Sequence, residues 1–184
     1  NKLVQVEDAV SASNYSIDID QQVSTNYLYD NWGNLIKDKK EKLDITWTAY
    51  GKVDSIYNDN TDLAINFGYD ASQNRLSKRV ITTASSDTVT SYYIRAAQGN
   101  IMAIYELRDD TVRWIEQDVY GSSRLGVLNP DSVVYPPTTY SQFFHFLQGK
   151  KQYELTNHLG NVLTTINDRK LGQDNTTDDT YDYW

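Results

Sequence analysis

The chain has 184 residues, which is long enough to bury a core as one domain. Its net charge of −8 disfavours nucleic acid and anionic membranes as partners, because both attract basic surfaces. The lack of cysteine excludes disulfides and thiolate sites, and no apolar run approaches the ~20 residues that a membrane-inserted helix needs.

Residues 1–22 are the least patterned part of the chain. Leu3, Val4 and Val6 favour a short strand, and residues 15–19 alternate apolar and polar side chains as an exposed strand does. The chain starts at Asn1 without a signal-like segment, which predicts that it is a piece of a longer protein.

The stretch YLYDNWGNLIK, residues 27–37, predicts a tight β-hairpin. Asp30 at the first turn position can accept a backbone N–H from two residues on, and Gly33 at the fourth can take a positive φ. A type I turn closed by a left-handed glycine is a favoured hairpin loop. Tyr27 and Tyr29 are two residues apart, so they share one face of the incoming strand.

The same frame returns five more times. The positions that close the turn are 33, 51, 73, 99, 121 and 160, which gives steps of 18, 22, 26, 22 and 39 residues. Two strands and two turns fit each shorter step, so the pattern indicates a repeat architecture in which each unit packs against its neighbours. The residues expected to form this repeat are Tyr29, Asp30, Gly33, Gly51, Tyr69, Asp70, Gly99, Asp118, Gly121, Asn157 and Gly160.

Several copies depart from the frame. Thr48, Ala96 and Asn157 stand where an aspartate is expected, and of these only Ala96 has no side chain able to cap the turn. Gln73 replaces the turn glycine and is predicted to hold a positive φ at some cost.

From residue 23 to residue 128 the pattern predicts antiparallel strands joined by short polar turns. Residues 43–50 place Leu43, Ile45 and Trp47 on one face, and residues 62–70 repeat that alternation. Residues 111–115 are expected to pair with residues 101–107.

Residues 129–140 break the rhythm. They contain all three prolines, and because proline removes a donor from the strand ladder, the segment is predicted to be an excursion at a sheet edge. A strand over residues 142–147 and a turn at residues 148–150 are expected next. Residues 169–184 are acidic and polar and are predicted to form a loop, or an end ordered only by further sequence.

The sequence shows no catalytic constellation. The two histidines are His145, among phenylalanines, and His158, in a repeat turn, and a structural role is predicted for both. His158, Asp168 and a serine could be drawn as a triad, but no spacing supports it.

Two acidic runs are candidate calcium sites. Residues 59–62 and 174–179 offer oxygen ligands, yet both lack the glycine and distant glutamate of the known loop pattern, so Asx-rich turns are the preferred interpretation. Trp32, Trp47 and Trp114 could form a stacking platform for sugars, but cross-strand pairs in a broad sheet are preferred.

The repeated pattern resembles the Rhs/YD-repeat proteins, named for a tyrosine-aspartate pair such as Tyr29-Asp30 and Tyr69-Asp70. The matching stretches are YLYDNWGNLIK, FGYDASQNRLSK, YYIRAAQGNIMAIY, VYGSSRLG and YELTNHLGNVL, and the last two resemble the entrance to the Rhs-associated core region. The resemblance covers roughly residues 23–168.

The resemblance implies an all-β fold, in which antiparallel β-hairpin repeats form a curved sheet that is part of a spiralling β-shell. Residues 1–22 would continue from an upstream repeat and residues 23–128 would form the repeat sheet. Residues 129–168 would lead into the core region and residues 169–184 would be an acidic tail.

In bacterial members of this family the shell encloses a C-terminal toxin, and related repeats occur in insecticidal toxin complexes and in animal adhesion proteins. The implied role is a structural segment that encapsulates or presents a toxin or effector in a secreted or cell-surface protein. The implied partners are the rest of the polypeptide, export machinery, and a cell-surface protein or glycan. Many members of the family cleave themselves through aspartates in a DPxG-type motif. This motif is absent here, so no enzymatic role and no cofactor are expected.

Two alternatives stay open. A binding or adhesion module would use exposed tyrosines and the proline-rich excursion to hold a glycan or a protein. An enzyme fragment such as a glycosidase would need two carboxylates roughly 5–10 Å apart across a cleft.

Overall fold

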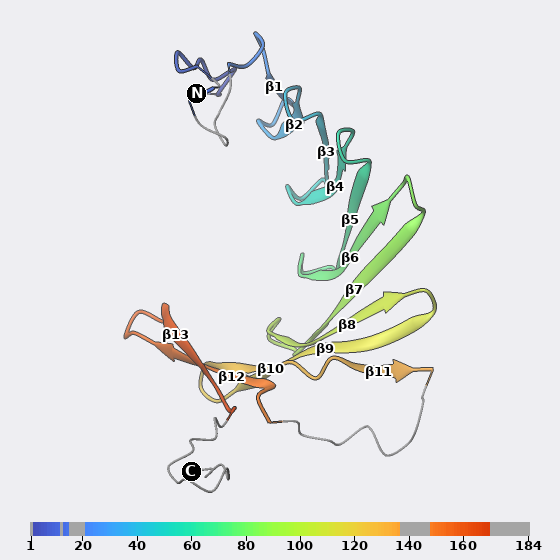
Figure 1. Cartoon of the computed structure of the whole chain (residues 1–184), viewed down its shortest axis with the longest axis vertical. Helices are drawn as coiled ribbons and strands as arrows, with labels where there is room; N and C mark the ends of the chain where they lie inside the picture. Colours follow the sequence, from blue (N-terminus) through green and yellow to red (C-terminus); the bar gives the residue numbers. More distant parts are fainter. Residues whose placement is uncertain (1, 12, 15–20, 137–147, 170–184) are drawn as a thin grey trace, which may run out of the picture. The chain divides into compact units, whose positions relative to one another are not determined.

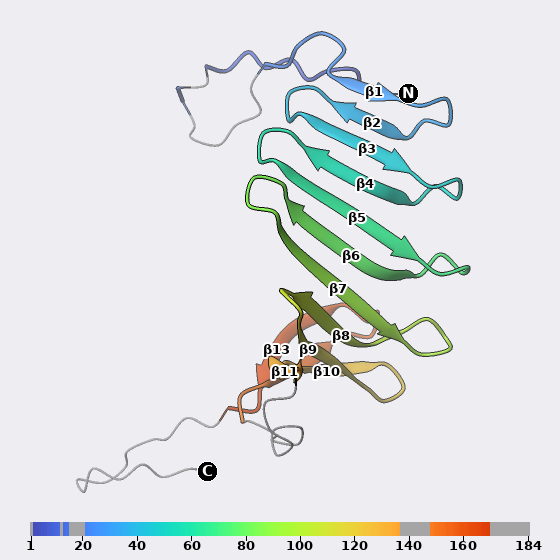
Figure 2. The same cartoon turned by 90° about the vertical axis from the view of Figure 1, so that its right-hand side faces the viewer.

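The structure is a computed structural model that describes residues 2–11, 13–14, 21–136 and 148–169. In these ranges the chain is all-β, and its 13 antiparallel strands belong to one open sheet (Figures 1 and 2). The all-β, antiparallel class predicted from the sequence is therefore confirmed. The strands are β1 (Tyr27–Tyr29), β2 (Leu35–Asp38), β3 (Leu43–Trp47), β4 (Val53–Asn58), β5 (Leu63–Tyr69), β6 (Arg75–Thr82), β7 (Asp87–Arg95), β8 (Ile101–Arg108), β9 (Thr111–Tyr120), β10 (Arg124–Leu128), β11 (Ser132–Tyr135), β12 (Lys151–Thr156) and β13 (Val162–Asn167).

The strand order follows the chain. Neighbours run from β1 to β10 and then to β12 and β13, while β11 pairs with β9 beside this path. The chain divides into two compact units, Asn1–Thr90 and Ser91–Trp184, with β7 crossing the division. The described residues contain no helix long and apolar enough to cross a membrane.

The central strands of the first unit carry an apolar row on one face and a polar row on the other. Across β3 to β6 the register aligns Ile45, Ile56, Ile65 and Val80 in one half-buried row. The neighbouring row, on the opposite face, runs Thr46, Ser55, Asn66 and Arg79 and is mostly exposed. β-Branched residues pair well across strands, so the period-two alternation of the sequence explains both the strands and their two faces.

The loops at the two ends of these strands differ in length. Five-residue loops join β1 to β2, β3 to β4 and β5 to β6, whereas four-residue loops join β2 to β3, β4 to β5 and β6 to β7. Each four-residue loop ends on a positive φ, at Lys42, Asp62 and Ser86. Each four-residue loop is also bonded to the previous one. Asp59 N–H donates to the Lys42 carbonyl, and Thr83 N–H donates to the Asp62 carbonyl.

In the second unit, the long strand β9 serves three partners. β8 pairs along it, β10 pairs with its residues 117–120, and β11 pairs with its residues 112–114. The predicted pairing of residues 111–115 with 101–107 is present, across the two left-handed residues Asp109 and Asp110. The proline-rich segment contributes β11, so it departs from the chain-order path, as predicted, but includes a paired strand.

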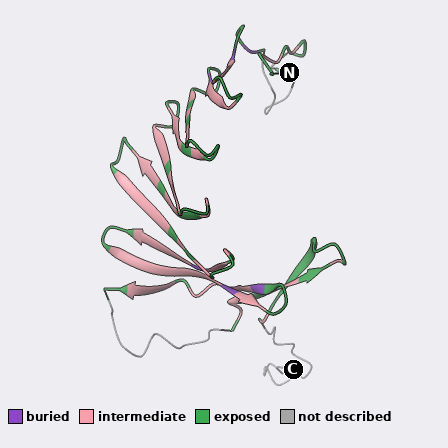
Figure 3. Cartoon of the chain, turned by 180° about the vertical axis from the view of Figure 1, so that it is seen from behind, coloured by how far each residue is buried: buried purple, intermediate pink, exposed green. Residues whose placement is uncertain are grey.

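Few side chains of the described residues are buried, although the length of the chain would allow a core. Ala103 and Leu128 are the apolar residues that count as buried there, and most strand residues are half-buried (Figure 3). The physical reason is that a single sheet layer has two faces, and strand pairing alone shields only part of each side chain. The most buried side chain is polar: Asn26 donates to Asp38 and accepts from Lys40 N–H.

Other predicted segments differ or cannot be compared. Residues 3–6 form no strand, although the carbonyls of Val4 and Val6 accept N–H groups from Tyr27 and Gln22. The strands predicted over residues 15–19 and 142–147 lie outside the described residues, as do His145, the acidic run at 174–179 and nearly all of the acidic tail.

Candidate functional site

The repeated feature of this chain is a hairpin with two recurring elements, and the first of them is the five-residue turn that closes it. In the first turn Asp30 N–H donates to the Asn34 carbonyl and Gly33 N–H to the Asp30 carbonyl, with Gly33 at φ +95°. The Asp30 carboxylate accepts the N–H groups of Trp32 and Asn34 and the side-chain amide of Asn34. The turn is thus closed by both backbone and side-chain bonds.

These bonds set the protonation of Asp30. Desolvation raises the pKa of its carboxyl group, but the hydrogen bonds from the Asn34 amide and from the N–H groups of Asn34, Trp32 and Gly33 together outweigh it and lower the pKa. A lowered folded pKa gives stability that is present at neutral pH and lost as the pH falls through that pKa. The turn therefore favours the charged aspartate.

The same bonds recur where the frame predicted them. Asp70 accepts from the N–H and side-chain amide of Asn74, and the Asn157 side chain accepts from the N–H groups of Leu159 and Asn161. Thr48 accepts from Lys52 N–H, whereas Ala96 keeps only the backbone bonds, to Asn100 and Gly99. The closing glycines Gly51, Gly99 and Gly160 all have positive φ.

Gln73 closes the third turn at φ +65°, as the sequence predicted. A residue with a Cβ is strained in this region, whereas glycine is not. We expect Gln73→Gly to raise the free energy of unfolding by about 0.5–1 kcal/mol, which is about 2 °C in Tm. Calorimetry of both proteins measures it, with Gly51→Gln as the reciprocal variant, which we expect to lose a similar amount. A Gln73→Gly protein that is less stable would show that the glutamine side chain stabilises the turn.

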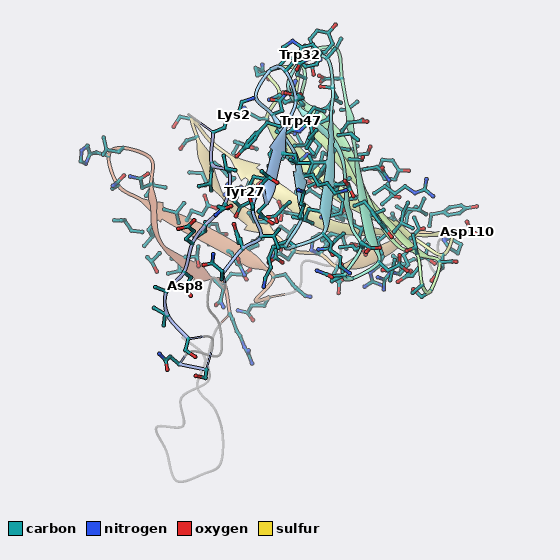
Figure 4. All side chains as sticks on the ribbon, turned by 90° about the horizontal axis from the view of Figure 1, so that it is seen from above. Lys2, Asp8, Tyr27, Trp32, Trp47 and Asp110 are labelled. Atoms are coloured by element: carbon teal, nitrogen blue, oxygen red, sulfur yellow. The ribbon has the colours of Figure 1, made fainter. Side chains whose placement is uncertain are left out.

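The second recurring element is an aromatic side chain that bonds its hairpin to the neighbouring one. The last residue of an incoming strand donates a side-chain hydrogen bond to the carbonyl of the first residue of the preceding strand. The three pairs are Trp47 Nε1 with Leu35 O (2.8 Å), Tyr69 OH with Val53 O (2.7 Å) and Tyr120 OH with Ile101 O (2.9 Å). Figure 4 shows Trp47 lying within the sheet, in contrast to Trp32 at its outer end. Of the two Tyr-Asp pairs, the one that makes such a bond through its tyrosine is Tyr69-Asp70.

Removing one such bond gives a direct test. Tyr69→Phe keeps the ring but leaves the Val53 carbonyl without its partner, and we expect a loss of about 1 kcal/mol of unfolding free energy. The control is Tyr92→Phe, because the Tyr92 hydroxyl has no hydrogen bond within the described residues and the ring is 42% exposed. Chemical denaturation measures both, and equal stabilities of the two variants would contradict the role of the tie.

The predicted turn at residues 117–121 is wrong. Strand β9 continues to Tyr120, and Asp118 lies inside it instead of in a turn. Gly121 does not have a positive φ, and it begins the turn, with its N–H donating to the Ser123 carbonyl. The repeat frame was placed three residues too early here. Tyr120 makes the hydrogen bond between hairpins, so Gly121 occupies the position that Asp30 holds in the first turn.

Asp118 instead belongs to a charge cluster in which its own carboxylate and that of Glu154 are poorly exposed, whereas Arg124 is 43% exposed. Arg124 bonds Glu154 through two nitrogens, at 2.5 and 3.1 Å, and lies 3.4 Å from Asp118, whose side chain is only 2% exposed. Glu116 precedes Asp118 by two residues on β9, so it shares its face. The cluster joins β9, β10 and β12, and neither Arg124 nor Glu154 stands out in the sequence because their contact depends on strand pairing.

Burial controls the titration of this cluster. Desolvation raises the pKa of Asp118, although the charge and hydrogen bond of Arg124 oppose it. Desolvation and the nearby charge of Asp118 also raise the pKa of Glu116. A hydrogen bond from Arg124 to Glu154 raises the pKa of Arg124, which keeps the guanidinium charged. The bonds of Arg124 therefore connect three strands.

The remaining chemical candidates are separated by the fold. His158 lies at the tip of the β12–β13 hairpin, whereas Asp168 follows β13 at its base and accepts the N–H groups of Gly149 and Lys151. The run at residues 59–62 is engaged in turn bonds, with Asp59 paired to Lys42 and Asp62 accepting from Tyr57. No group of three or more His, Asp or Glu residues in the described ranges could hold a metal ion.

Comparisons with known proteins add no family. No protein-family model matches the chain, and no curated protein matches it in sequence.

Two of the three tryptophans in the described residues are held by hydrogen bonds to backbone carbonyls. Trp47 donates to Leu35 and Trp114 donates to the Glu116 carbonyl, each within its own unit, while Trp32 is 88% exposed. Sequence reasoning missed the asparagine that directly follows the closing position, Asn34 and Asn74 above all. This asparagine is present in four of the five frames that form the turn. That recurrence was the available signal.

Proposed function

We propose that this chain is a wall segment of an Rhs/YD-repeat-type β-shell, with the structural role of enclosing or presenting a C-terminal toxin or effector. The observation that supports it is the repeated hairpin: hairpins follow one another in chain order, each is closed by turn bonds, and aromatic side chains bond neighbouring hairpins together. A sheet built in this way can be extended by adding hairpins, as repeat architectures are.

The distribution of burial supports the same role. The central strands of the first unit carry an apolar row on one face and a polar row on the other, and few side chains in the described residues are buried. A layer of this kind separates two environments without needing a core of its own. In this proposal the partners are the flanking repeats and the enclosed domain of the same polypeptide, the protein is secreted or at the cell surface, and the segment is not an enzyme.

The deciding experiment is intact-mass analysis of the natural full-length protein purified from its host. A C-terminal piece that is cleaved yet stays bound would support enclosure and would identify the cargo. A single uncut chain without a bound cargo would contradict the wall role. It would favour the second candidate, a binding module, which the exposure of Trp32 (88%) and Tyr50 (77%) supports.

The last strand in the sheet order gives a further prediction. β13 has one strand neighbour, β12, among the described residues, contains no charge or proline, and exposes Leu163 (70%) and Ile166 (52%). Such an edge invites pairing with another strand. We therefore expect the isolated 184-residue chain to self-associate through β13, as light scattering at increasing concentration would show.

A charge on this edge should prevent the association. Leu163→Lys places a lysine on β13, while the control Leu76→Lys adds the same charge on β6, which has neighbours on both sides. We expect only the β13 variant to shift the chain toward monomer. A monodisperse wild-type monomer at high concentration would contradict the prediction.

A further inference from the structure

A stretch of the same chain covers the outer edge of β1. Residues 2–8, here called the edge segment, form no strand but lie antiparallel to β1 (Figures 2 and 4). The Val4 carbonyl accepts the Tyr27 N–H at 3.0 Å, while Lys2 reaches Asp30, which directly follows β1. Among the described residues β1 has one strand neighbour, β2, so its outer edge can take an added strand.

Gln22 offers the edge segment the bonds that a neighbouring strand would offer. Its N–H donates to the Val6 carbonyl at 3.3 Å, and its side-chain Oε1 accepts the Val6 N–H at 2.8 Å. A pair of bonds to the N–H and carbonyl of one residue is the pattern of an antiparallel ladder. Gln22 is only 9% exposed and its Nε2 donates to the Tyr27 hydroxyl at 2.9 Å, so the side chain is held in place. These bonds to Val6 engage backbone groups, so they place no demand on its side chain.

The edge does recognise one side chain of this segment. The Lys2 ammonium group donates to the Asp30 carbonyl at 3.2 Å and lies 5.3 Å from the centre of the Tyr29 ring. A cation within about 6 Å of an aromatic centre is attracted to the face of the ring. Leu3 and Val4, in contrast, are 54% and 49% exposed. The edge therefore favours a basic residue beside the first turn and tolerates varied side chains after it.

The edge segment is an occupant that another peptide can replace. The Glu7 carboxylate accepts a hydrogen bond from the Gln5 amide, within the segment, instead of from the sheet. An edge that binds mainly through backbone bonds can exchange one extended segment for another, as in β-strand addition. The net charge of −8 favours a basic segment over a second copy of this acidic chain.

We propose that the β1 edge binds an extended basic peptide segment of another protein, which takes the place of the edge segment as an added strand. A lysine or arginine of the peptide lies against Tyr29 and Asp30, and its backbone bonds to Tyr27 and Gln22. The proposal adds a partner at the β1 end of the strand order, and it does not rest on the wall role. Its failure would leave the intact-mass experiment unaffected.

The test is fluorescence polarisation of a labelled peptide with the 184-residue chain, at about 0.15 M salt to screen long-range attraction. The basic peptide has the sequence of residues 1–10, NKLVQVEDAV, with the changes Glu7→Lys and Asp8→Lys. We expect saturable binding that is about tenfold tighter to a Val6→Pro chain than to the wild type. Proline removes the N–H that Gln22 accepts, so the chain's own segment competes less. Equal affinity for the two chains, or no saturable binding, would overturn the proposal.

Two proline peptides of equal charge separate strand addition from attraction by charge. Neighbouring N–H groups of an extended segment point to opposite sides, so the Val6 N–H faces Gln22 and the Gln5 N–H faces away. Val6→Pro in the basic peptide should weaken binding about tenfold, whereas Gln5→Pro should leave it unchanged. Equal affinities of these two peptides would contradict strand addition. Tighter binding of the unaltered peptide than of the basic one would favour a second copy and overturn the choice of partner.

Variants locate the site. In the Val6→Pro chain, Gln22→Ala removes the side-chain acceptor and is expected to weaken binding of the basic peptide about fivefold. The matched control is Gln98→Ala, which truncates an exposed glutamine of the second unit and is expected to change nothing. Lys2→Ala in the peptide should weaken binding about two- to fivefold, because it removes the contact with the Tyr29 ring. Nuclear magnetic resonance spectra verify the fold of each variant. Equal effects of Gln22→Ala and Gln98→Ala would contradict the proposal.

Discussion

Gly126→Val is expected to detach the β12–β13 hairpin from β10. Gly126 is buried in β10 opposite Tyr153, and a Cβ at this position would overlap the Gln152 carbonyl oxygen and lie 3.0 Å from the Tyr153 Cα. Both obstacles are backbone atoms, which cannot move aside as a flexible side chain can. We expect a loss of about 3 kcal/mol, at the upper end of overpacking costs.

Hydrogen exchange would measure this effect strand by strand. Amides of β12 and β13 should lose protection, while those of β3 to β6 in the first unit keep theirs. The control is Gly121→Ala, whose added Cβ would be 3.2 Å from the flexible Cδ1 of Leu125 at a position without positive φ. Continued protection of β12 in Gly126→Val would show that the close approach of β10 and β12 does not require a glycine at this position.

Arg124→Ala is expected to be the second largest single change. It removes the partner of two poorly exposed carboxylates, Asp118 at 2% and Glu154 at 11% side-chain exposure. Breaking a buried ion pair leaves a charge without compensation, and because Arg124 itself is 43% exposed we expect about 2–3 kcal/mol at pH 7. The surface pair of Lys37 with Asp44 provides the control, since Lys37→Ala should change stability by less than about 0.5 kcal/mol.

The pH dependence of the loss follows from the raised pKa values of Asp118 and Glu116. A carboxyl group whose folded pKa is raised adds stability below its unfolded value, about 4, and this stability is lost as the pH rises through the folded pKa. Without Arg124 the two pKa values rise further, so the deficit should shrink as the pH falls toward 4. Denaturation across this range measures it, and a constant deficit would contradict the explanation.

A second substitution separates charge from packing. Asp118→Asn in the Arg124→Ala background removes the uncompensated charge and should recover part of the lost stability at pH 7. If the double variant is no more stable than Arg124→Ala, the arginine acts by packing its side chain and not by neutralising Asp118.

Five of the six predicted turns followed from residue type and spacing alone. Asp30 bonds to groups within four residues of it, Asp70 repeats these bonds, and Gln73 takes the positive φ that its place in the frame demands. Interactions of such short range depend little on the rest of the molecule, so residue type and spacing suffice to predict them. Strand alternation was predictable for the same reason.

Contacts between strands could not be predicted, because strand pairing and register determine which residues meet. The tie from Trp47 to Leu35 and the contact of Arg124 with Glu154 span 12 and 30 residues, and they form only when the register is fixed. Register also explains the error at Asp118: an aspartate three residues before a glycine has the spacing of a turn, but β9 pairs with β10 up to Tyr120 and keeps it in a strand. The close approach at Gly126 likewise comes from pairing with β12, which no local pattern encodes.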